Sequence, residues 1–304
     1  MYHNYRVMFE DLLSVGGLSL DRLKNFCAVA EAGGIARVTD GDPARQSLYS
    51  RQIRELEQFF GVELTRRHGK GIELTEAGRE LSRQARLAFT GLSDFKAGAA
   101  GMSADIRIGS GNSVLEWMLI PKLRAIRETT KGARFTFQLF DFRTADTIRG
   151  LLEHTLDFGI VRSGAVIAPL KFHSLGEIGY QLFIPKRLQK KITASDAAQC
   201  ELAISTGGEF AAKLEASARK ARIPLQIAYR CTSLTQAARL VQEQTCCAIL
   251  PEIAAEFLGD TASATELPWL KSYRRNLGIA WHPRLLEARP QIAPLFNSLK
   301  QFLN

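Results

Sequence analysis

The chain has 304 residues, of which 46% are hydrophobic and 23% charged, and a formal net charge of +9 at pH 7. This length favours two or more compact units, and the composition is that of a globular protein rather than a disordered one. No apolar run is long enough to span a membrane, and the first residues lack a signal-peptide pattern, so we expect a cytoplasmic protein.

The basic surplus suggests an anionic partner, but it is unevenly distributed. Residues 1–98 hold 14 basic against 13 acidic side chains, whereas residues 99–304 hold 26 against 18. Within the first part, residues 45–70 carry six basic and three acidic side chains. Affinity for nucleic acid depends on where the arginines lie more than on the total charge, so this local run is the stronger indication. The five cysteines, an odd number without CxxC spacing, favour reduced buried thiols and argue against a metal site.

Residues 1–17 read as a short extension, and the first clear helix follows them. Ser19 can cap a helix from Leu20 to about Ala32, which Gly33-Gly34 ends. Residues 35–40 predict a short second helical turn. The side chains expected to face inward from the first helix are Leu23, Phe26, Ala30 and Cys27.

The stretch from Asp42 to Gly61 predicts one amphipathic helix. Asp42 is a suitable N-cap, Pro43 fits the first helical position, and Gly61 is a suitable terminator. The face expected to meet a core carries Tyr49, Ile53, Leu56 and Phe60. The opposite face carries short or fork-shaped donors, which suit base edges and phosphates of a DNA major groove: Gln46, Ser47, Ser50, Arg51 and Arg54. Taken alone, an ordinary surface helix would be the simpler interpretation.

Residues 62–75 predict a hairpin that supports the DNA-binding interpretation. Two short alternating segments flank Gly69-Lys70-Gly71, so the hairpin has a basic tip. Three short helices followed by such a hairpin outline a winged helix-turn-helix. Arg66, Arg67 and Lys70 would then reach backbone phosphates beside the recognition helix. The alternative is a plain surface hairpin.

A long helix is expected after Thr75, which can cap it. One stripe of this helix is apolar at roughly heptad spacing and consists of Leu81, Ala85, Ala88, Leu92 and Phe95. Pairing of this stripe with a second copy would give the dimer that a palindromic DNA site requires. The alternative is that the helix packs on its own winged domain.

With these elements in place, the sequence closely resembles the LysR-type transcriptional regulators. The matching residues are Leu20–Glu31, Gln46–Glu57, Gly61–Leu64, Arg67 and Gly69–Gly78. The resemblance implies DNA contact by Gln46, Ser47, Ser50 and Arg51 and a dimerising linker helix from Thr75. Two departures stand out: residues 38–42 replace the usual alanines and buried leucine, and Arg45 stands where a small hydroxyl residue is common, so it joins the expected DNA-contacting residues.

From Ser103 onward, strand and helix patterns alternate and predict a two-lobed α/β domain. The first lobe is expected at about residues 103–183 and 277–304, and the second at about 184–276. The predicted strands are 105–109, 135–140, 156–161, 182–185, 202–205, 226–230, 247–250 and 277–281. The predicted helices are 113–128, 144–154, 209–220, 233–243 and 291–302.

This second region resembles the LysR-type effector domain, which is itself similar to periplasmic solute-binding proteins. The resemblance depends on the opening strand DIRIGSG, the LDFGIV segment, LFIP at the crossover and CAILP late in the second lobe. The usual glycine pair before CAILP is replaced by Gln244-Thr245-Cys246. The overall expectation is an α/β protein with a winged helix-turn-helix at residues 18–75, a linker helix at 76–102 and a two-lobed effector-binding domain at 103–304.

Enzymatic interpretations find little support. Gly109-Ser-Gly-Asn-Ser113 starts like a nucleotide-binding loop, but Val114 stands where a third glycine belongs. There is no GxSxG or HExxH motif, and the five histidines are scattered. A solute-binding protein is the more serious alternative for residues 103–304, but it would carry an export signal and no winged helix.

The effector is expected where strands end and helices begin on both sides of the cleft between the lobes. Seven polar side chains follow predicted strands there: Ser110, Asn112, Ser113, Arg162, Thr206, Thr232 and Ser233. Several of them could equally be helix caps. Arg162 and the basic surplus favour a small anionic effector such as a carboxylate. The expected partners are thus double-stranded DNA, a small effector, one or three further copies of the chain, and RNA polymerase; no cofactor, metal or membrane is expected.

Overall fold

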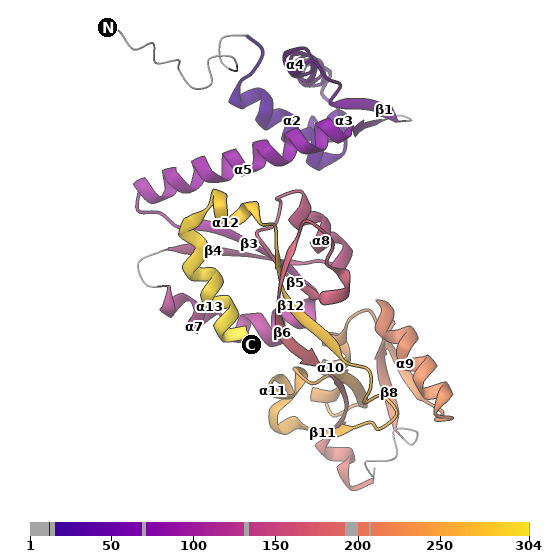
Figure 1. Ribbon diagram of the computed structural model, residues 1–304. Helices are drawn as coiled ribbons and strands as arrows, with labels where there is room; N and C mark the ends of the chain where they lie inside the picture. The colour runs from indigo at the N-terminus through magenta and orange to yellow at the C-terminus, as the bar shows by residue number, and fades with distance from the viewer. Residues whose placement is uncertain are drawn as a thin grey trace. The chain divides into compact units, whose positions relative to one another are not determined.

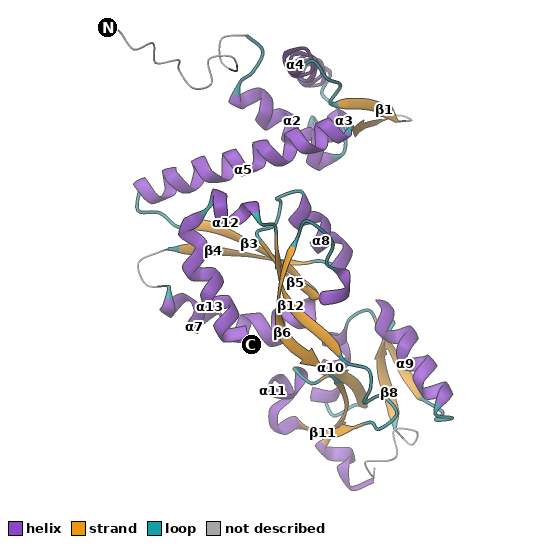
Figure 2. Ribbon diagram, viewed as in Figure 1, coloured by secondary structure: helices purple, strands orange, loops and turns teal. Residues whose placement is uncertain are grey.

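The computed structural model describes residues 12, 16–68, 71–130, 134–191, 200–206 and 208–303. The chain divides into two compact units, one holding residues 1–101 and the other residues 102–151 and 156–304. Figures 1 and 2 show the first as mainly helical and the second as two sheets with helices packed against them. Among the described residues, no helix has both the length and the apolar character needed to cross a membrane.

The first unit is a winged helix-turn-helix followed by a long helix. Its elements are α2 (Leu20–Ala32), α3 (Ile35–Val38), α4 (Pro43–Phe60), β1 (Thr65–His68), β2 (Gly71–Leu74) and α5 (Glu76–Ala99). The three predicted caps are confirmed: Ser19 accepts a hydrogen bond from the backbone of Arg22, Asp42 from those of Ala44 and Arg45, and Thr75 from that of Gly78. Gly33 and Gly61 end α2 and α4 with φ of 67° and 66°, which glycine adopts without steric cost.

A small hydrophobic core joins α2, α3 and α4. Its buried members are Phe26, Val29, Ile35, Ile53, Leu56 and Leu64. The predicted core residues Leu23, Tyr49 and Phe60 are partly buried against it. Two side-chain bridges add to the contact between α2 and α4: Arg22 Nε lies 2.6 Å from Glu55 Oε2, and Asn25 donates to Gln52 over 2.7 Å.

The turn between α3 and α4 is built around a buried hydroxyl. Thr39 is fully buried and donates from Oγ1 to the carbonyl of Ile35 over 2.8 Å. Asp40 lies in the left-handed region with φ of 51° and is exposed, so the aspartate does not take the buried place that a leucine would fill. The chain therefore reaches Asp42 in an extended conformation ready to cap α4.

The predicted apolar stripe of α5 divides into two parts. Leu81 packs against the winged-domain core and Ala85 is buried, so the N-terminal half of the helix belongs to its own domain. Ala88, Leu92 and Phe95 are exposed. The stripe therefore does not form one continuous free surface, and the interface role of Leu81 stays a prediction.

Gly78 explains how α5 approaches the wing so closely. A Cβ atom at this position would lie 2.0 Å from the carbonyl oxygen of Leu64. A side chain of any size would push α5 away from the wing, because the obstructing atom is backbone.

The first lobe of the second unit contains a five-stranded sheet in the order β4-β3-β5-β12-β6. Its strands are β3 (Ala104–Ser110), β4 (Phe135–Asp141), β5 (Phe158–Arg162), β6 (Lys171–Ile178) and β12 (Arg275–Trp281). Strand β3 is parallel to β4 and β5, whereas β12 is antiparallel to β5 and β6. The helices are α6 (Asn112–Val114), α7 (Leu123–Thr129), α8 (Thr144–Leu152), α12 (Arg284–Ala288) and α13 (Ala293–Leu303). Strand β6 was not among the predicted elements.

The predicted helix at residues 113–128 is wrong as a single element. It is broken into α6, a π-helical turn at Leu115–Leu119, a 3-10 turn at Ile120–Lys122 and α7. Pro121 lacks a backbone N–H and cannot continue a regular helix, which accounts for the break after Leu119.

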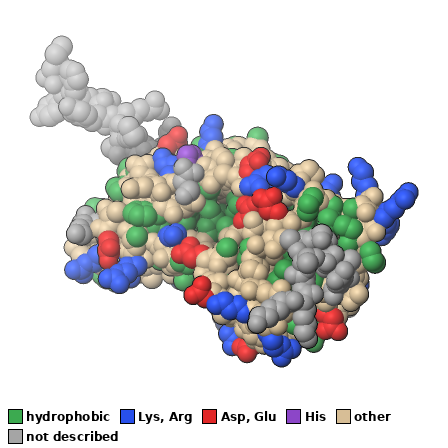
Figure 3. Space-filling view, turned by 90° about the horizontal axis from the view of Figure 1, so that it is seen from below, with side chains coloured by type: hydrophobic (Ala, Val, Ile, Leu, Met, Phe, Trp, Pro, Cys, Tyr) green, Lys and Arg blue, Asp and Glu red, His purple; other side chains and the backbone are tan. Residues whose placement is uncertain are grey.

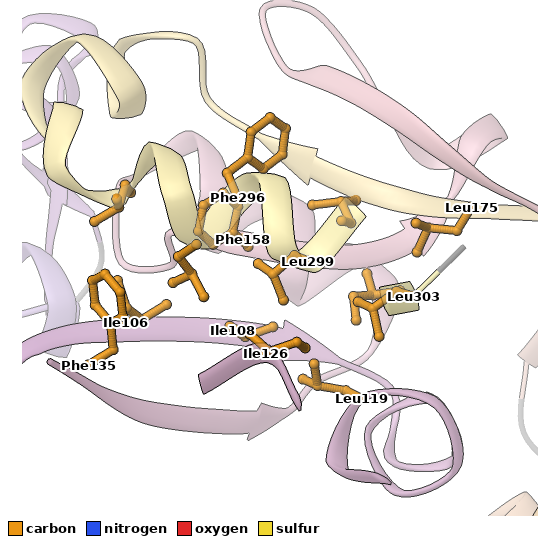
Figure 4. Close-up of a cluster of buried hydrophobic side chains, with 14 of the residues drawn as sticks. Ile106, Ile108, Leu119, Ile126, Phe135, Phe158, Leu175, Phe296, Leu299 and Leu303 are labelled. Carbon is orange, nitrogen blue, oxygen red and sulfur yellow. The ribbon is translucent and has the colours of Figure 1, made fainter. Parts of the chain in front are cut away.

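Helices α7 and α13 cover one face of this sheet. Figure 4 shows Phe296, Leu299 and Leu303 of α13 among the side chains of β3 and β5, including Ile106, Ile108 and Phe158. The rings of Phe158 and Phe296 stack with their centroids 5.6 Å apart.

Helix α8 covers the opposite face. At Gly109 a Cβ atom would lie 2.5 Å from Leu156 Cδ1 and 3.4 Å from Thr147 Cγ2. This glycine near the end of β3 therefore serves close packing.

This lobe contains a buried ion pair. Arg289 is only 1% exposed, and its Nη1 lies 2.8 Å from Asp157 Oδ1, which also faces Arg107 Nη2 at 3.1 Å. Arg289 Nη2 donates to the carbonyl of Asp105 over 2.8 Å. The buried carboxylate of Asp157 is thereby paired with two guanidinium groups. They belong to Arg289 and Arg107, which lie 132 and 50 residues from Asp157 in sequence.

The second lobe has a five-stranded sheet in the order β11-β7-β10-β8-β9. Its strands are β7 (Tyr180–Pro185), β8 (Glu201–Ser205), β9 (Gln226–Cys231), β10 (Cys247–Pro251) and β11 (Ala262–Glu266), and its helices are α9 (Gly208–Lys220), α10 (Leu234–Gln242) and α11 (Ala254–Leu258). Helix α9 contributes Phe210 and Leu214 to one core cluster, and α10 contributes Ala237, Ala238 and Val241 to another.

The predicted lobe boundary at residues 183 and 184 falls inside β7. All of β7 pairs with β10 and β11, so the first crossing lies near Gly179, and β12 returns the chain to the first lobe from Arg275. Strand β11 was not predicted, because residues 262–266 alternate without large apolar side chains.

Candidate functional site

The outer face of α4 presents the polar side chains expected to contact DNA. Arg45, Ser47, Arg51 and Arg54 are exposed, whereas Gln46 and Ser50 are half-buried. Arg51 is 70% exposed in its side chain, and its Nε lies 3.8 Å from Glu55 Oε1. Because Glu55 is already held by Arg22, Arg51 is only loosely paired and can turn its donors outward.

The wing adds basic side chains next to α4. Arg66 lies opposite Glu73 in the β1–β2 register and forms an ion pair with it at 3.0 Å. Arg67 is exposed on the same strand. The predicted phosphate contact Lys70 lies outside the described residues.

A pocket of about 130 Å³ lies between the two lobes of the second unit. It is lined mainly by apolar side chains, with polar groups from both lobes. The lining residues are Ser110, Gly111, Ser113, Val114, Thr144, Ile160, Val161, Arg162, Ile178, Tyr180, Leu234, Pro251, Ile253, Arg275 and Leu277.

Three predicted effector residues of the first lobe line this pocket: Ser110, Ser113 and Arg162. The Ser110 hydroxyl donates to the carbonyl of Ile160 over 2.7 Å, so its oxygen is left to accept a hydrogen bond from a ligand. Asn112 is not in the lining. Its amide donates across the lobes to Thr235 Oγ1 at 3.3 Å.

The three residues predicted from the second lobe do not line this pocket, so their effector role stays a prediction. Thr206 is exposed and donates to the carbonyl of Cys231 over 3.0 Å. The backbone N–H of Thr232 donates a hydrogen bond to the side-chain oxygen of Gln236. The Ser233 hydroxyl caps α10 by accepting a hydrogen bond from the backbone N–H of Gln236. These hydroxyls satisfy local backbone and side-chain groups at strand and helix ends, as capping residues do.

Arg275 is the main pocket residue that the sequence patterns missed. Its Nε donates to the Tyr273 hydroxyl over 2.5 Å, and its guanidinium carbon lies 5.0 Å from the Tyr273 ring centroid. Its Nη2 is buried without a hydrogen-bond partner among the described residues. The antiparallel register explains the position: β12 starts where β5 ends, so Arg275 comes close to Arg162. The basic pair at residues 274–275 was the available signal.

Aromatic side chains form the environment of Arg275. Tyr180 stacks on Phe210 with ring centroids 3.9 Å apart. The ring centroids of Tyr180 and Tyr273 are 5.5 Å apart. Burial raises the pKa of the Tyr180 hydroxyl to about 12, so it stays protonated at neutral pH. The pocket therefore places a guanidinium beside aromatic rings and the neutral hydroxyl of Tyr180.

One acidic side chain reaches these arginines from the second lobe. Glu209, in the first turn of α9, forms an ion pair with Arg162, and its Oε2 lies 4.0 Å from Arg275 Nη2. The hydrogen bond from Arg162 lowers the pKa of the Glu209 carboxyl, which is therefore ionised at neutral pH. On the molecular face drawn in Figure 3, basic and acidic side chains lie beside one another, so the local arrangement of arginines matters more than the net charge.

Trp117 connects the lobes at a second point. It lies on the π-helical turn of the first lobe but is buried in a core cluster of the second lobe, where it stacks on Phe257 at 5.7 Å. All five cysteines are free and buried, and burial raises the pKa of Cys246 to about 11, which argues against reactive thiols. The described residues contain no group of three or more potential metal ligands.

Comparisons with known proteins match both units. A family model described as "Bacterial regulatory helix-turn-helix protein, lysR family" matches residues 20–79, and one described as "LysR substrate binding domain" matches residues 99–303. The uncharacterized HTH-type transcriptional regulator YnfL of Escherichia coli (strain K12) is 30% identical over 158 residues, which cover 49% of this chain and 51% of YnfL. The chain spans about half the length of the curated relatives it matches.

Solved structures match over nearly the whole chain. ArgP from Mycobacterium tuberculosis has a TM-score of 0.65 at 19% identity, over 94% of this chain and 98% of ArgP. Full-length CbnR complexed with its target DNA has a TM-score of 0.57 at 21% identity, over 93% of this chain and 99% of CbnR. At these identities the likeness establishes the fold.

Proposed function

The chain belongs to the LysR family, and we propose that it is a transcriptional regulator that binds DNA through α4 and responds to a small anionic effector between the lobes of its second unit. The observation that carries the DNA role is the row of exposed arginine and serine side chains on α4, with Gln46 and Ser50 half-buried among them, next to a wing with two exposed arginines. Such fork-shaped and short donors suit base edges and phosphates.

The family context supports this role over the alternative of a solute-binding module. A module of that kind needs no winged helix, whereas residues 20–79 match a regulatory helix-turn-helix model. CbnR, which shares the fold, is described in complex with target DNA. The matched relatives are regulators rather than enzymes.

Dimerisation through α5 is part of the proposal. Leu92 and Phe95 are 53% and 78% exposed, and with Ala88 they form an apolar surface on the part of the helix beyond Ala85. Pairing of this surface with a second copy would place two winged domains on one DNA duplex, as a palindromic site requires.

The pocket supports the effector role. Polar groups converge in a mainly apolar cavity, which is the usual character of small-molecule sites. Arg162 and Arg275 favour an anion there. Since the pocket contains groups of both lobes, an occupant would contact both and could change their relative position.

Substitution of Arg51 tests the DNA role directly. DNA sites are first selected from a random pool with the unaltered protein, and affinities are then measured by fluorescence anisotropy. Arg51→Ala should weaken binding to the selected site by about 1–3 kcal/mol, the range for a good base contact, and change binding to unrelated DNA less. The matched control is Arg124→Ala, which should leave affinity unchanged. Arg124 lies in the other unit, and its side chain is 92% exposed. Equal affinities for Arg51→Ala and the unaltered protein would contradict the assignment of α4.

A further inference from the structure

The two arginines of the pocket differ in whether their guanidinium N–H groups have hydrogen-bond partners. Arg162 is bonded to the Glu209 carboxylate, and its side chain is 31% exposed. Arg275 is more buried, with 19% of its side chain exposed, and its Nε donates a hydrogen bond to the Tyr273 hydroxyl. Its Nη2 has no hydrogen-bond partner among the described residues, because the nearest Glu209 oxygen is 4.0 Å away, beyond hydrogen-bond distance.

Glu209 is held over the pocket but is not part of its lining. Its side chain is 64% exposed, and it is the second residue of α9. The next residue, Phe210, is buried against Tyr180 and anchors this end of the helix. The carboxylate thus reaches Arg162 from a fixed backbone position and stops short of Arg275.

A diffusible carboxylate can satisfy both arginines where Glu209 satisfies one. Two oxygens of one carboxylate can accept from two guanidinium groups, and hydrogen bonds between such charged groups are stronger than those between neutral ones. The remaining lining is mainly apolar and includes Ile160, Ile178 and Leu277. These side chains would contact an apolar body, which an inorganic anion lacks.

We propose that Glu209 is an internal placeholder for the carboxylate of the effector, and that the effector is a small carboxylate with an apolar body that displaces Glu209 from Arg162 and also binds Arg275. This inference rests on the proposed effector role of the pocket and adds the ligand class and the group that competes with it. Displacement would break an ion pair that joins the first lobe, through Arg162 at the end of β5, to α9 of the second lobe. Binding is thereby coupled to a contact between the lobes.

The placeholder makes a quantitative prediction. When an internal group occupies a site, the apparent affinity of the ligand falls by the fraction of time the site is free. Removing this exposed carboxylate should therefore tighten carboxylate binding by roughly threefold to tenfold. The matched control is Glu215, on the same helix, which pairs with Arg230 at 3.5 Å outside the pocket.

The experiment is calorimetric titration of the full chain and its variants with benzoate, benzamide, acetate and phosphate. Glu209→Ala should bind benzoate threefold to tenfold more tightly than the unaltered protein, and Glu215→Ala should bind it as the unaltered protein does. Benzamide, which lacks the charge, should show no gain. Adding Arg275→Gln to Glu209→Ala should abolish the gain. Thermal melts of each variant check that the fold is retained.

The outcomes separate the placeholder from the effector role itself. Equal benzoate affinity in Glu209→Ala and the unaltered protein would overturn the placeholder and leave an anion site in the pocket. Tighter binding of phosphate than of either carboxylate would overturn the ligand class. Absence of binding by all four probes to Glu209→Ala at millimolar concentration would overturn the whole inference, since a freed arginine pair should hold a carboxylate. The regulatory role is judged separately, by the DNA affinities of Arg51→Ala.

Discussion

Helix α4 and the interlobe pocket assemble their polar side chains in different ways. The candidate DNA-contacting residues of α4 lie between Arg45 and Arg54, on one helix whose geometry alone aligns them. The pocket gathers groups from Ser110 to Leu277, and its two arginines come from strands 113 residues apart in sequence. One surface depends on helical periodicity, and the other on the pairing of distant strands.

This difference implies different sensitivity to substitution. A surface on one capped helix needs only its own domain, whereas the pocket needs both sheets and the contacts that close them. The chain offers a convenient way to measure the two separately. All three tryptophans, at positions 117, 269 and 281, lie in the second unit, so their fluorescence reports that unit, while helical circular dichroism reports both.

The largest effect is expected at the buried ion pair of the first lobe. Arg289→Ala would leave Asp157 buried with Arg107 as its remaining cationic partner, and breaking a buried pair in this way typically costs about 3–5 kcal/mol. Chemical denaturation followed by tryptophan fluorescence should show this loss. The exposed neighbour Glu287→Ala is the control and should change stability little. A fluorescence midpoint unaltered by Arg289→Ala would mean that the pocket scaffold does not depend on this pair.

Gly78→Ala should have the next largest effect, and in the other unit. The new Cβ atom would lie 2.0 Å from the Leu64 carbonyl oxygen, so α5 must move from the wing at a cost of about 2–3 kcal/mol. Circular dichroism should report the loss while the fluorescence transition stays in place. Gly98→Ala, on the same helix with open space around it, should instead stabilise by up to about 1 kcal/mol through helix propensity. If the two substitutions behaved alike, the close approach of α5 and wing would be refuted.

The smallest effect concerns the assembly of α5. Leu92→Asp should weaken self-association by about 1.5 kcal/mol or more, roughly a tenfold rise in the dimer dissociation constant, because a half-exposed leucine would be replaced by a charge in an apolar contact. Sedimentation velocity over a concentration series measures this. Leu81→Ala should instead lower the stability of the first unit, because Leu81 packs on that unit's own core. An oligomer unaffected by Leu92→Asp would place the interface elsewhere.

Much of the first unit followed from sequence because its signals are local. Ser19, Asp42 and Thr75 cap the helices that they were expected to cap, and the spacing of Ile53 and Leu56 predicted the buried face of α4. The division of the α5 stripe could not be predicted, since heptad spacing is the same whether a leucine meets its own domain or a second copy.

In the second unit, the order of strands and helices was largely predictable, but only three of the seven predicted effector residues line the pocket. Ser110, Ser113 and Arg162 follow strand ends that face the pocket, whereas Thr206, Thr232 and Ser233 follow strand ends that do not. The sequence pattern is the same in both groups. The difference arises in the folded chain, where Thr206 bonds the carbonyl of Cys231 and where Thr232 and Ser233 bond Gln236.

By itself, the sequence determined the winged helix, the long helix and the alternating α/β order, because caps, glycines and apolar periodicity act within a few residues of one another. Tertiary structure alone decided that Arg275 would stand beside Arg162, that Glu209 would pair with Arg162 from another lobe, and that Arg289 would be buried against Asp157. Those contacts follow from strand register and packing between segments far apart in the chain, and no local propensity specifies them.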